Sequence, residues 1–112
     1  MYLFRYNIGM YLIKQSDTFV KWLSKLKDIK GKVSIIRRID RMKLGNFGDS
    51  KFLGEGISEL RIITGSGYRV YFTELEGEII ILLVGGDKSS QDEDIKKAKV
   101  IAKELKDENQ TK

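Results

Sequence analysis

Two alternating apolar runs joined by a glycine-rich turn occupy the middle of the chain. The segment ELRIITGSGYRVYF, residues 59–72, alternates apolar with polar side chains on both sides of the GSG turn at residues 65–67. Alternation with a period of two predicts β-strands, and a short glycine-rich joint predicts an antiparallel hairpin. Each strand keeps an arginine, Arg61 or Arg69, within its apolar pattern. Any fold for this chain must therefore contain a hairpin that accommodates the side chains of two arginines.

The length of the turn decides whether the two arginines share a face. Side chains alternate across a strand, so a two-residue turn would set Arg61 opposite an apolar residue. A three-residue turn at residues 65–67 instead pairs Thr64 with Tyr68 and brings both arginines and Tyr71 onto one face. Only this register keeps the apolar side chains together against the helices. We therefore predict that the hairpin clusters its arginines with Tyr71.

The remaining periodicities predict an α+β domain around this hairpin. Apolar residues recur at helical spacing in two segments before the hairpin, separated at Gly31, and in one segment after it. Four glycines without a sustained period predict a loop over residues 45–56. The predicted order is a short strand (11–16), a helix from Ser16 or Asp17 to about Asp28, a helix from Lys32 to Gly45, three antiparallel strands (57–64, 68–74 and 78–84) and a helix that opens at Asp92–Asp94.

The chain is predicted to form a single domain over residues 10–106. Its 112 residues are enough to bury one core. No repeat, linker or low-complexity tract divides the sequence. Residues 1–9 have no clear period and are assigned to an N-terminal extension, and the polar tail, residues 107–112, is predicted to fray.

The composition excludes several classes of active site. The chain has no cysteine and no histidine, which rules out disulfides, thiolate nucleophiles, Ser-His-Asp triads and zinc bound by Cys or His. Lys and Arg number 21 against 16 Asp and Glu, giving a net charge of +5 and a pI near 9.4. This balance suits a polyanion such as nucleic acid, although many small proteins are equally basic.

The sequence predicts a cytoplasmic protein. The longest apolar run, residues 79–84, is too short to span a bilayer, and the first ten residues lack signal-peptide features.

The arginine cluster has two interpretations. In the first, the face is solvated and Arg61 pairs with Glu59 or another carboxylate across the sheet. In the second, the arginines form a functional site with Lys88, which lies in a glycine-led loop after the central strand, where loops often carry functional groups. Lys51, in the glycine-rich loop before the hairpin, is either a further member of this site or a solvated lysine.

Several segments, in their order along the chain, resemble one known family. They are FVKWLSKLKD, a basic second helix that continues into RIDRMKLGNFGDSKFLGEGISELRI, then GSGYRVYF and LLVGGDKSSQDEDIKKA. Together they resemble the RelE/ParE superfamily of bacterial toxins, and most closely its small HigB-like "addiction module killer protein" branch. The resemblance extends from Phe19 to about Ala102. It implies a RelE-like α+β fold with a short N-terminal strand, a helical hairpin, a three-stranded antiparallel meander that completes a small sheet, and a C-terminal helix.

The resemblance also implies a ribosome-dependent endoribonuclease that cuts mRNA without a metal or other cofactor. In such enzymes the RNA 2′-hydroxyl attacks the adjacent phosphate, so the site must assist deprotonation, stabilise the phosphorane and protonate the leaving 5′-oxygen. On the family pattern, Arg61 and Arg69 stabilise the phosphate, Arg69 being the arginine of the GYR strand, and Lys88 supplies a basic group after the last strand. Asp87 is either a proton acceptor or a turn and helix-capping residue. Tyr71 either offers a phenol or a stacking surface, or packs in the sheet.

The basic second helix extends the RNA contacts that the resemblance implies. Its cations, together with Lys51, would follow ribosomal RNA phosphates, although a solvated helix face explains them equally well. These candidates are Lys32, Arg37, Arg38, Arg41, Lys43 and Lys51. The implied partners are mRNA, the ribosome and a cognate antitoxin, which would be a small helix-turn-helix protein encoded next to the toxin. The resemblance implies no association with a membrane.

One departure from the family pattern keeps other functions open. Several ribosome-dependent relatives carry a tyrosine or histidine at or just before the last helix, whereas this chain has SSQDEDI at residues 89–95. A ParE-like protein that inhibits DNA gyrase without chemistry of its own is therefore the alternative, because the same fold supports both functions. A degenerate toxin that only binds its antitoxin is a third.

Overall fold

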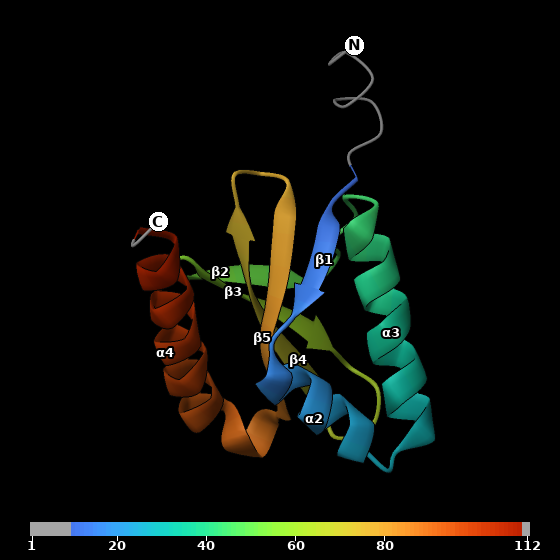
Figure 1. Cartoon of the computed structure of the whole chain (residues 1–112). Helices are drawn as coiled ribbons and strands as arrows, with labels where there is room; N and C mark the ends of the chain where they lie inside the picture. Colours follow the sequence, from blue (N-terminus) through green and yellow to red (C-terminus); the bar gives the residue numbers. More distant parts are fainter. Residues whose placement is uncertain (1–9, 111–112) are drawn as a thin grey trace.

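A mixed sheet of five strands lies between helices on its two faces (Figure 1). The computed structural model describes residues 10–110, so the predicted extension and the last two residues of the predicted tail lie outside the described residues. The strands lie in the order β1-β5-β4-β3-β2, with β1 parallel to β5 and the other neighbours antiparallel. This arrangement confirms the predicted α+β order of strand, two helices, antiparallel strands and C-terminal helix. The elements are β1 (Leu12–Gln15), α2 (Asp17–Lys25), α3 (Ile29–Lys43), β2 (Ser50–Gly54), β3 (Ile57–Ile62), β4 (Tyr68–Leu75), β5 (Ile79–Asp87), the 3-10 turn η1 (Lys88–Ser90) and α4 (Gln91–Gln110).

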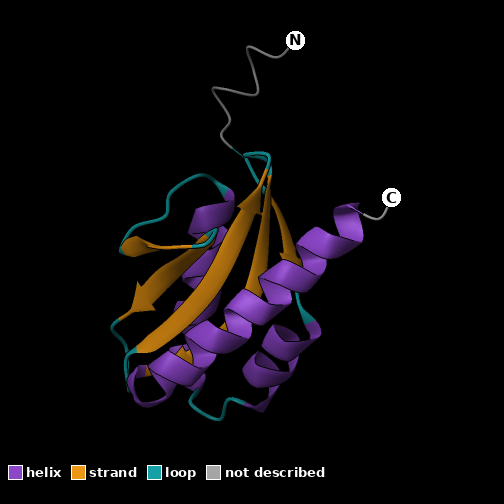
Figure 2. Cartoon of the chain, turned by 90° about the vertical axis from the view of Figure 1, so that its left-hand side faces the viewer, coloured by secondary structure: helices purple, strands orange, loops and turns teal. Residues whose placement is uncertain are grey.

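Each face of the sheet has its own apolar core. Helices α2 and α3 cover one face, where Phe19, Ile35 and Met42 pack against β3, β4 and β5. Helix α4 crosses the other face, as Figure 2 shows, and Ala98 packs there with Leu83. The same strands serve both cores because their successive side chains point to opposite faces. A charged side chain on these strands must therefore emerge at an edge or be paired beneath a helix.

Side-chain caps fix where the first two helices begin. Ser16 caps α2: its Oγ accepts a hydrogen bond from the N–H of Phe19 at 3.0 Å and donates one to the carbonyl of Leu83 at 2.6 Å. Asp28 caps α3 by accepting the N–H of Gly31 at 3.1 Å. Both caps satisfy main-chain donors that the first turn of a helix leaves without partners.

The predicted break at Gly31 is wrong. This glycine lies inside α3, which begins at Ile29, three residues before the predicted start at Lys32. A Cβ at position 31 would collide with the ring of Tyr68, which reaches the helix from β4. The glycine is therefore required by a close approach between helix and sheet, and it does not end a helix.

The sheet has one strand more than the sequence predicts. Residues 50–54 of the predicted loop form β2, an edge strand that pairs antiparallel with β3 and becomes irregular between Phe52 and Gly54. Strand β5 is also longer than predicted, since it continues through Gly85 and Gly86 to Asp87. The first three residues of the predicted loop between the last strand and the last helix are therefore strand.

The loop between β3 and β4 is longer than predicted. Arg69 lies opposite Arg61 and the loop spans residues 63–67, so the predicted pairing of Thr64 with Tyr68 is wrong. Because the register moves by two residues, the side chains keep their predicted faces. The two arginines therefore share a face, as predicted, and it is the face that α4 covers along much of its length.

Helix α4 is longer than predicted at its C-terminal end. It runs from Gln91 to Gln110, so residues 107–110 of the predicted polar tail are helical, and the helix passes the predicted domain end at residue 106. An acidic first turn at residues 92–94 complements the positive end of its dipole, as the sequence analysis expects. Within residues 10–110, no helix combines the length and the apolar character needed to cross a membrane.

Candidate functional site

A cationic hollow opens between the β3–β4 loop, α3 and η1. It consists of two adjoining parts, of about 330 Å³ and about 280 Å³, that share Asp49, Arg61, Ile62 and Ile63 in their walls. We call both parts together the basic cleft. Among the described residues, six cations line it against one carboxylate, that of Asp49. The cations are Arg37, Arg38 and Arg41 of α3, Arg61 of β3, Arg69 of β4 and Lys88 of η1.

The sheet itself brings the two predicted arginines together. Arg61 and Arg69 stand directly opposite each other, and each is balanced by its own carboxylate, because like charges in such a pair repel. Arg61 places Nε 3.2 Å and Nη2 3.0 Å from Oδ1 of Asp49, with both side chains 43% exposed. Arg69 places Nε 2.7 Å from Oε1 of Glu59, with the side chains 12% and 3% exposed. Solvent screens the first pair, whereas the second pair is shielded and fixes its arginine.

Hydrogen bonds between side chains join the two walls of the basic cleft. Tyr68, at the start of β4, donates its hydroxyl proton to Oδ2 of Asp28 at 2.6 Å, and Thr64 donates to Oγ of Ser34 at 3.0 Å. The first bond raises the pKa of Tyr68 and lowers the pKa of Asp28. Both bonds tie the β3–β4 region to α3, so the cleft is formed before any ligand binds.

Arg38 stabilises the wall of the basic cleft that α3 forms. Its guanidinium donates to the main-chain carbonyls of Arg61 at 2.6 Å, Phe47 at 2.9 Å and Asp49 at 3.2 Å. Burial, and after it the charge of Arg41, lowers the pKa of Arg38. Arg38 is predicted to contact RNA, but its guanidinium donors are engaged by main-chain carbonyls of the protein.

Lys88 and Asp87 follow β5 and have different roles. Lys88 lines the basic cleft beside Gly67, and its ammonium group makes no hydrogen bond or ion pair within residues 10–110. Asp87 caps η1, accepting hydrogen bonds from Oγ of Ser89 at 2.6 Å and from its N–H at 2.8 Å. These bonds lower the pKa of Asp87 and make it a weaker base. Of the two roles that the sequence allows Asp87, the cap is the one that the structure contains.

Tyr71 does not reach the basic cleft. Its ring is 0% exposed beneath α4, in the core that contains Leu83 and Ala98. The hydroxyl is buried with no hydrogen-bond partner among the described residues. Burial, and then the charges of Glu59 and Asp94, raise the pKa of Tyr71. The predicted use of Tyr71 as a reactive phenol or stacking surface is therefore wrong, and the residue packs in the sheet.

The other predicted RNA-binding cations divide into two groups. Arg37 and Arg41 line the basic cleft, and their guanidinium groups are free of ion pairs and hydrogen bonds in the described part of the chain. Lys32, Lys43 and Lys51 do not line it. A row of free cations therefore leads from α3 to the paired arginines of the sheet.

Asp49 and Ile63 are prominent among the residues of the basic cleft that the sequence does not predict. Asp49, just before β2, lines both parts of the cleft and pairs with Arg61. Ile63, the first residue of the β3–β4 loop, is 86% exposed and also lines both parts. No local signal marks Asp49, because it precedes a strand that periodicity does not detect. Ile63 continues the apolar pattern of β3, which predicts burial.

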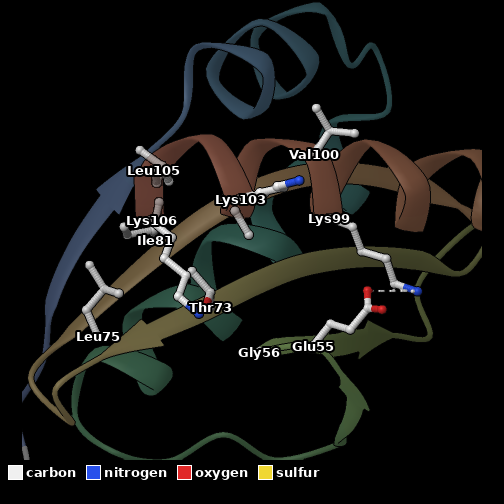
Figure 3. Close-up of a pocket in the computed structure, with 11 residues that line it drawn as sticks. Glu55, Gly56, Thr73, Leu75, Ile81, Lys99, Val100, Lys103, Leu105 and Lys106 are labelled. Carbon is white, nitrogen blue, oxygen red and sulfur yellow. Dashed lines mark ion pairs between the residues drawn. The ribbon is translucent and has the colours of Figure 1, made fainter. Parts of the chain in front are cut away.

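A larger hollow of about 840 Å³ lies between the second half of α4 and strands β4 and β5 (Figure 3). Leu75, Ile81 and Leu105 give it apolar walls, and Lys99 pairs with Glu55 across its mouth at 3.3 Å. It contains none of the site residues that the sequence predicts. The basic cleft is therefore the candidate functional site.

The side chains of the basic cleft suit a phosphate-containing ligand. Arginine and lysine bind phosphate oxygens through charge and directed N–H donors, and the two arginines of adjacent strands line the same part of the cleft. In the described residues, His, Cys, Asp and Glu form no group of three or more that could hold a metal ion. The side chains available for chemistry are thus six cations, the carboxylate of Asp49 and the hydroxyls of Ser34, Thr64 and Ser66.

The five-stranded sheet and its helices define the structural class of the protein: the chain has a RelE-like α+β fold. A solved structure of the E. coli toxin RelE, a double arginine-to-alanine mutant in the free state, is similar with a TM-score of 0.61 and 14% sequence identity, over 78% of this chain and 96% of that chain. The chain belongs to the family described as "Phage derived protein Gp49-like (DUF891)", which it matches over residues 21–107. An uncharacterized protein of Haemophilus influenzae strain Rd is 56% identical over 93 residues, which are 83% of this chain and 94% of that protein.

Proposed function

We propose that this chain is the toxin of a type II toxin–antitoxin system, a HigB-like member of its superfamily, and that it cleaves mRNA on the ribosome without a metal. The basic cleft carries the proposal. Two arginines face each other on adjacent strands, and three free cations, Lys88, Arg37 and Arg41, lie beside them. Such a row fits the phosphates of a single RNA strand.

The proposed chemistry is attack of the RNA 2′-oxygen on the adjacent phosphorus, with release of the 5′-oxygen. Arg61 and Arg69 bind the non-bridging oxygens and stabilise the charge that builds on the crowded phosphorane. Lys88, whose ammonium group is free, protonates the departing 5′-oxygen. Asp49 takes the place of Asp87 as the proton acceptor for the 2′-hydroxyl, because Asp49 lines the cleft and Asp87 caps η1.

The proposal includes the partners that such a toxin requires. The ribosome positions the mRNA, and Arg37 and Arg41 contact RNA phosphates next to the reacting one. A small helix-turn-helix antitoxin, encoded next to the toxin, silences it by binding. Both partners are encountered in the cytoplasm. A neighbouring gene of this type would support the toxin assignment under any mechanism.

The test is primer extension on mRNA in a purified translation system, with and without ribosomes. Arg61→Ala and Lys88→Ala change exposed members of the cleft, and Lys103→Ala removes a lysine from the other hollow as a matched control. We expect wild type and the control to produce new 5′ ends only with ribosomes. The two cleft variants should cleave at least about 100-fold more slowly, as for the loss of a group that stabilises transition-state charge.

Arg69 needs a different substitution. Arg69→Ala would leave the Glu59 carboxylate buried without its cation, which costs about 3–5 kcal/mol and risks unfolding. Arg69→Lys keeps the charge and removes the planar fork of donors, so we expect a folded protein with strongly reduced cleavage.

One observation supports the gyrase alternative: no aromatic residue lines the described part of the basic cleft, so no ring is available to stack on a base. If folded wild-type protein is toxic in cells but produces no cleavage on ribosomes, the ribonuclease proposal is refuted. If the protein then inhibits the DNA supercoiling activity of purified gyrase, its function is ParE-like. If it inhibits neither translation nor gyrase, it is a protein that binds only its antitoxin.

A further inference from the structure

A buried carboxylate lies directly behind the basic cleft. Glu59 on β3 is 3% exposed, and its Oε1 is 2.7 Å from Nε of Arg69 on β4. The same oxygen accepts a hydrogen bond from Nε2 of Gln91, the first residue of α4, at 3.3 Å. Glu59 stands opposite Tyr71 in the register, so it meets Arg69 diagonally across the two strands. One carboxylate oxygen thus links β3, β4 and α4.

The contact with Glu59 engages only one edge of the Arg69 guanidinium. Nε faces the carboxylate, while the side chain, 12% exposed, also lines the basic cleft. The N–H of Nε is not aligned for a good hydrogen bond, so attraction between charges holds the pair. A guanidinium is planar and its donors form a rigid fork. Because the Arg69 side chain is also largely buried, holding Nε against the carboxylate restricts the direction of the remaining donors.

We infer that Glu59 is a positioning residue for the reaction: it holds the guanidinium of Arg69 in the orientation that meets the scissile phosphate. This inference rests on the proposed ribonuclease function. Glu59 acts through Arg69 and touches neither the RNA nor the reacting atoms, because α4 and the sheet cover it. Donors that are oriented before the substrate binds need no reorganisation when charge develops in the transition state.

The second arginine of the cleft provides the contrast. Arg61 and its partner Asp49 are both 43% exposed, so water competes for the pair and the side chain can adjust to the RNA. Arg69 and Glu59 are shielded on the α4 face. Arg69 is therefore the preorganised arginine of the two, and its alignment depends on a neighbour that the sequence analysis considers only as a partner for Arg61.

The experiment separates positioning from a purely structural role by comparing kcat with KM. Glu59→Gln keeps the shape of the side chain and its contact with Gln91 but removes the charge that holds Arg69. Steady-state cleavage of ribosome-bound mRNA should show kcat reduced about 10- to 100-fold, with KM within about threefold of wild type, as expected when a reacting group is misplaced by a fraction of an ångström. The matched control is Glu55→Gln, which removes an equal charge from an exposed ion pair with Lys99, outside the basic cleft.

The outcomes are distinct. A folded Glu59→Gln variant with the kcat of wild type would overturn the inference. This holds even if the melting temperature of the variant is changed, because such a result means that Glu59 has only a structural role. If Glu59→Gln does not fold, Glu59→Asp replaces it, since the shorter side chain keeps the charge and withdraws the carboxylate from Arg69. The inference requires a reduced kcat in that variant too, and wild-type kcat would overturn it.

A second measurement keeps this inference apart from the proposed function. In ¹⁵N–¹H spectra, the Nε–H of Arg69, assigned with Arg69→Lys, should be a separate, slowly exchanging signal in wild type and in Glu55→Gln. In Glu59→Gln it should move towards the signals of exposed arginines. If wild type does not cleave RNA at all, the proposed function fails, and this signal alone decides whether Glu59 orients Arg69: an unchanged signal overturns the inference.

Discussion

Replacing Tyr71 with phenylalanine should stabilise the protein. Tyr71 is 0% exposed, and its hydroxyl has no hydrogen-bond partner in the described part of the structure. A buried polar group without a partner costs about 1–3 kcal/mol of folding free energy, and Tyr71→Phe removes this group while keeping the ring. For a domain of this size, each kcal/mol changes the melting temperature by about 4 °C, so we expect an increase of about 4–12 °C.

A tyrosine on the same strand provides a control with the opposite sign. Tyr68 is 5% exposed, and its hydroxyl donates to Asp28 at 2.6 Å. Tyr68→Phe removes a formed hydrogen bond and should lower the free energy of unfolding by about 1 kcal/mol. Both changes delete one oxygen from a buried ring, so the difference in sign reports only whether the hydroxyl is bonded.

The pH dependence gives an independent check on Tyr71. Burial, and then the charges of Glu59 and Asp94, raise the pKa of its phenol above the ordinary value of about 10. As the pH rises through about 10, the unfolded chain releases a proton that the folded chain retains, and the wild type loses stability. Tyr71→Phe has no such proton. Its advantage over wild type should therefore widen between about pH 9 and pH 11, because the other tyrosines titrate equally in both proteins.

Urea unfolding followed by circular dichroism, at several pH values between 7 and 11, measures both effects in one series. A decrease in unfolding free energy for Tyr71→Phe at pH 7 would refute the reasoning, since it would mean that the hydroxyl is bonded, through a water molecule or through Glu59 or Asp94. A pH-independent difference between the two proteins would refute the argument about the pKa. Cleavage activity should not change in Tyr71→Phe, because the ring does not line the basic cleft.

Three further predictions concern the glycine contacts, the first helix cap and the RNA track. Gly85→Ala should lower the free energy of unfolding by about 1–3 kcal/mol, because the new Cβ collides with the Trp22 ring of α2, and an unchanged denaturation midpoint would contradict this close packing. Ser16→Ala removes the cap of α2 and a hydrogen bond to the carbonyl of Leu83, so thermal unfolding should show a loss of about 1–2 kcal/mol, against no loss for exposed Ser24→Ala. For binding of an uncleavable single-stranded RNA, Arg37→Ala should reduce the slope of log affinity against log salt concentration by about 0.7. The control Lys103→Ala should leave this slope unchanged. Equal slopes for wild type and Arg37→Ala would mean that Arg37 does not contact the RNA.

Periodicity predicts the long elements of this fold because burial imposes it. Helix α2 and strands β3 to β5 each bury a continuous row of side chains, and their patterns are visible in the sequence. Strand β2 is an edge strand whose first three residues are exposed, so burial imposes no pattern on it. Gly31 shows a second limit: its neighbour Tyr68 lies far along the chain, and the contact between them has no local signature.

In the site, too, features that follow from local sequence patterns are predictable, and features that depend on contacts between distant segments are not. The clustering of Arg61 with Arg69 is predictable, because a register error of two residues leaves every side chain on its face. The separate role of Arg38 is not predictable. In sequence it cannot be distinguished from Arg37 and Arg41, and only the fold brings the carbonyl groups of Phe47 and Asp49 within its reach.

The end of β5 explains why residues on one face have such different roles. Tyr71 and Arg69 point the same way from β4 and are about 7 Å apart along the strand, yet one is in the core and the other lines the basic cleft. What separates them is the line along which α4 crosses the sheet, and this line begins where the chain leaves β5. Asp87 caps the turn at that point and Gln91 starts the helix. The cap residue therefore contributes to the site by fixing how far α4 covers the arginine face, and substitution of Asp87 should change cleavage only as far as it changes the position of α4.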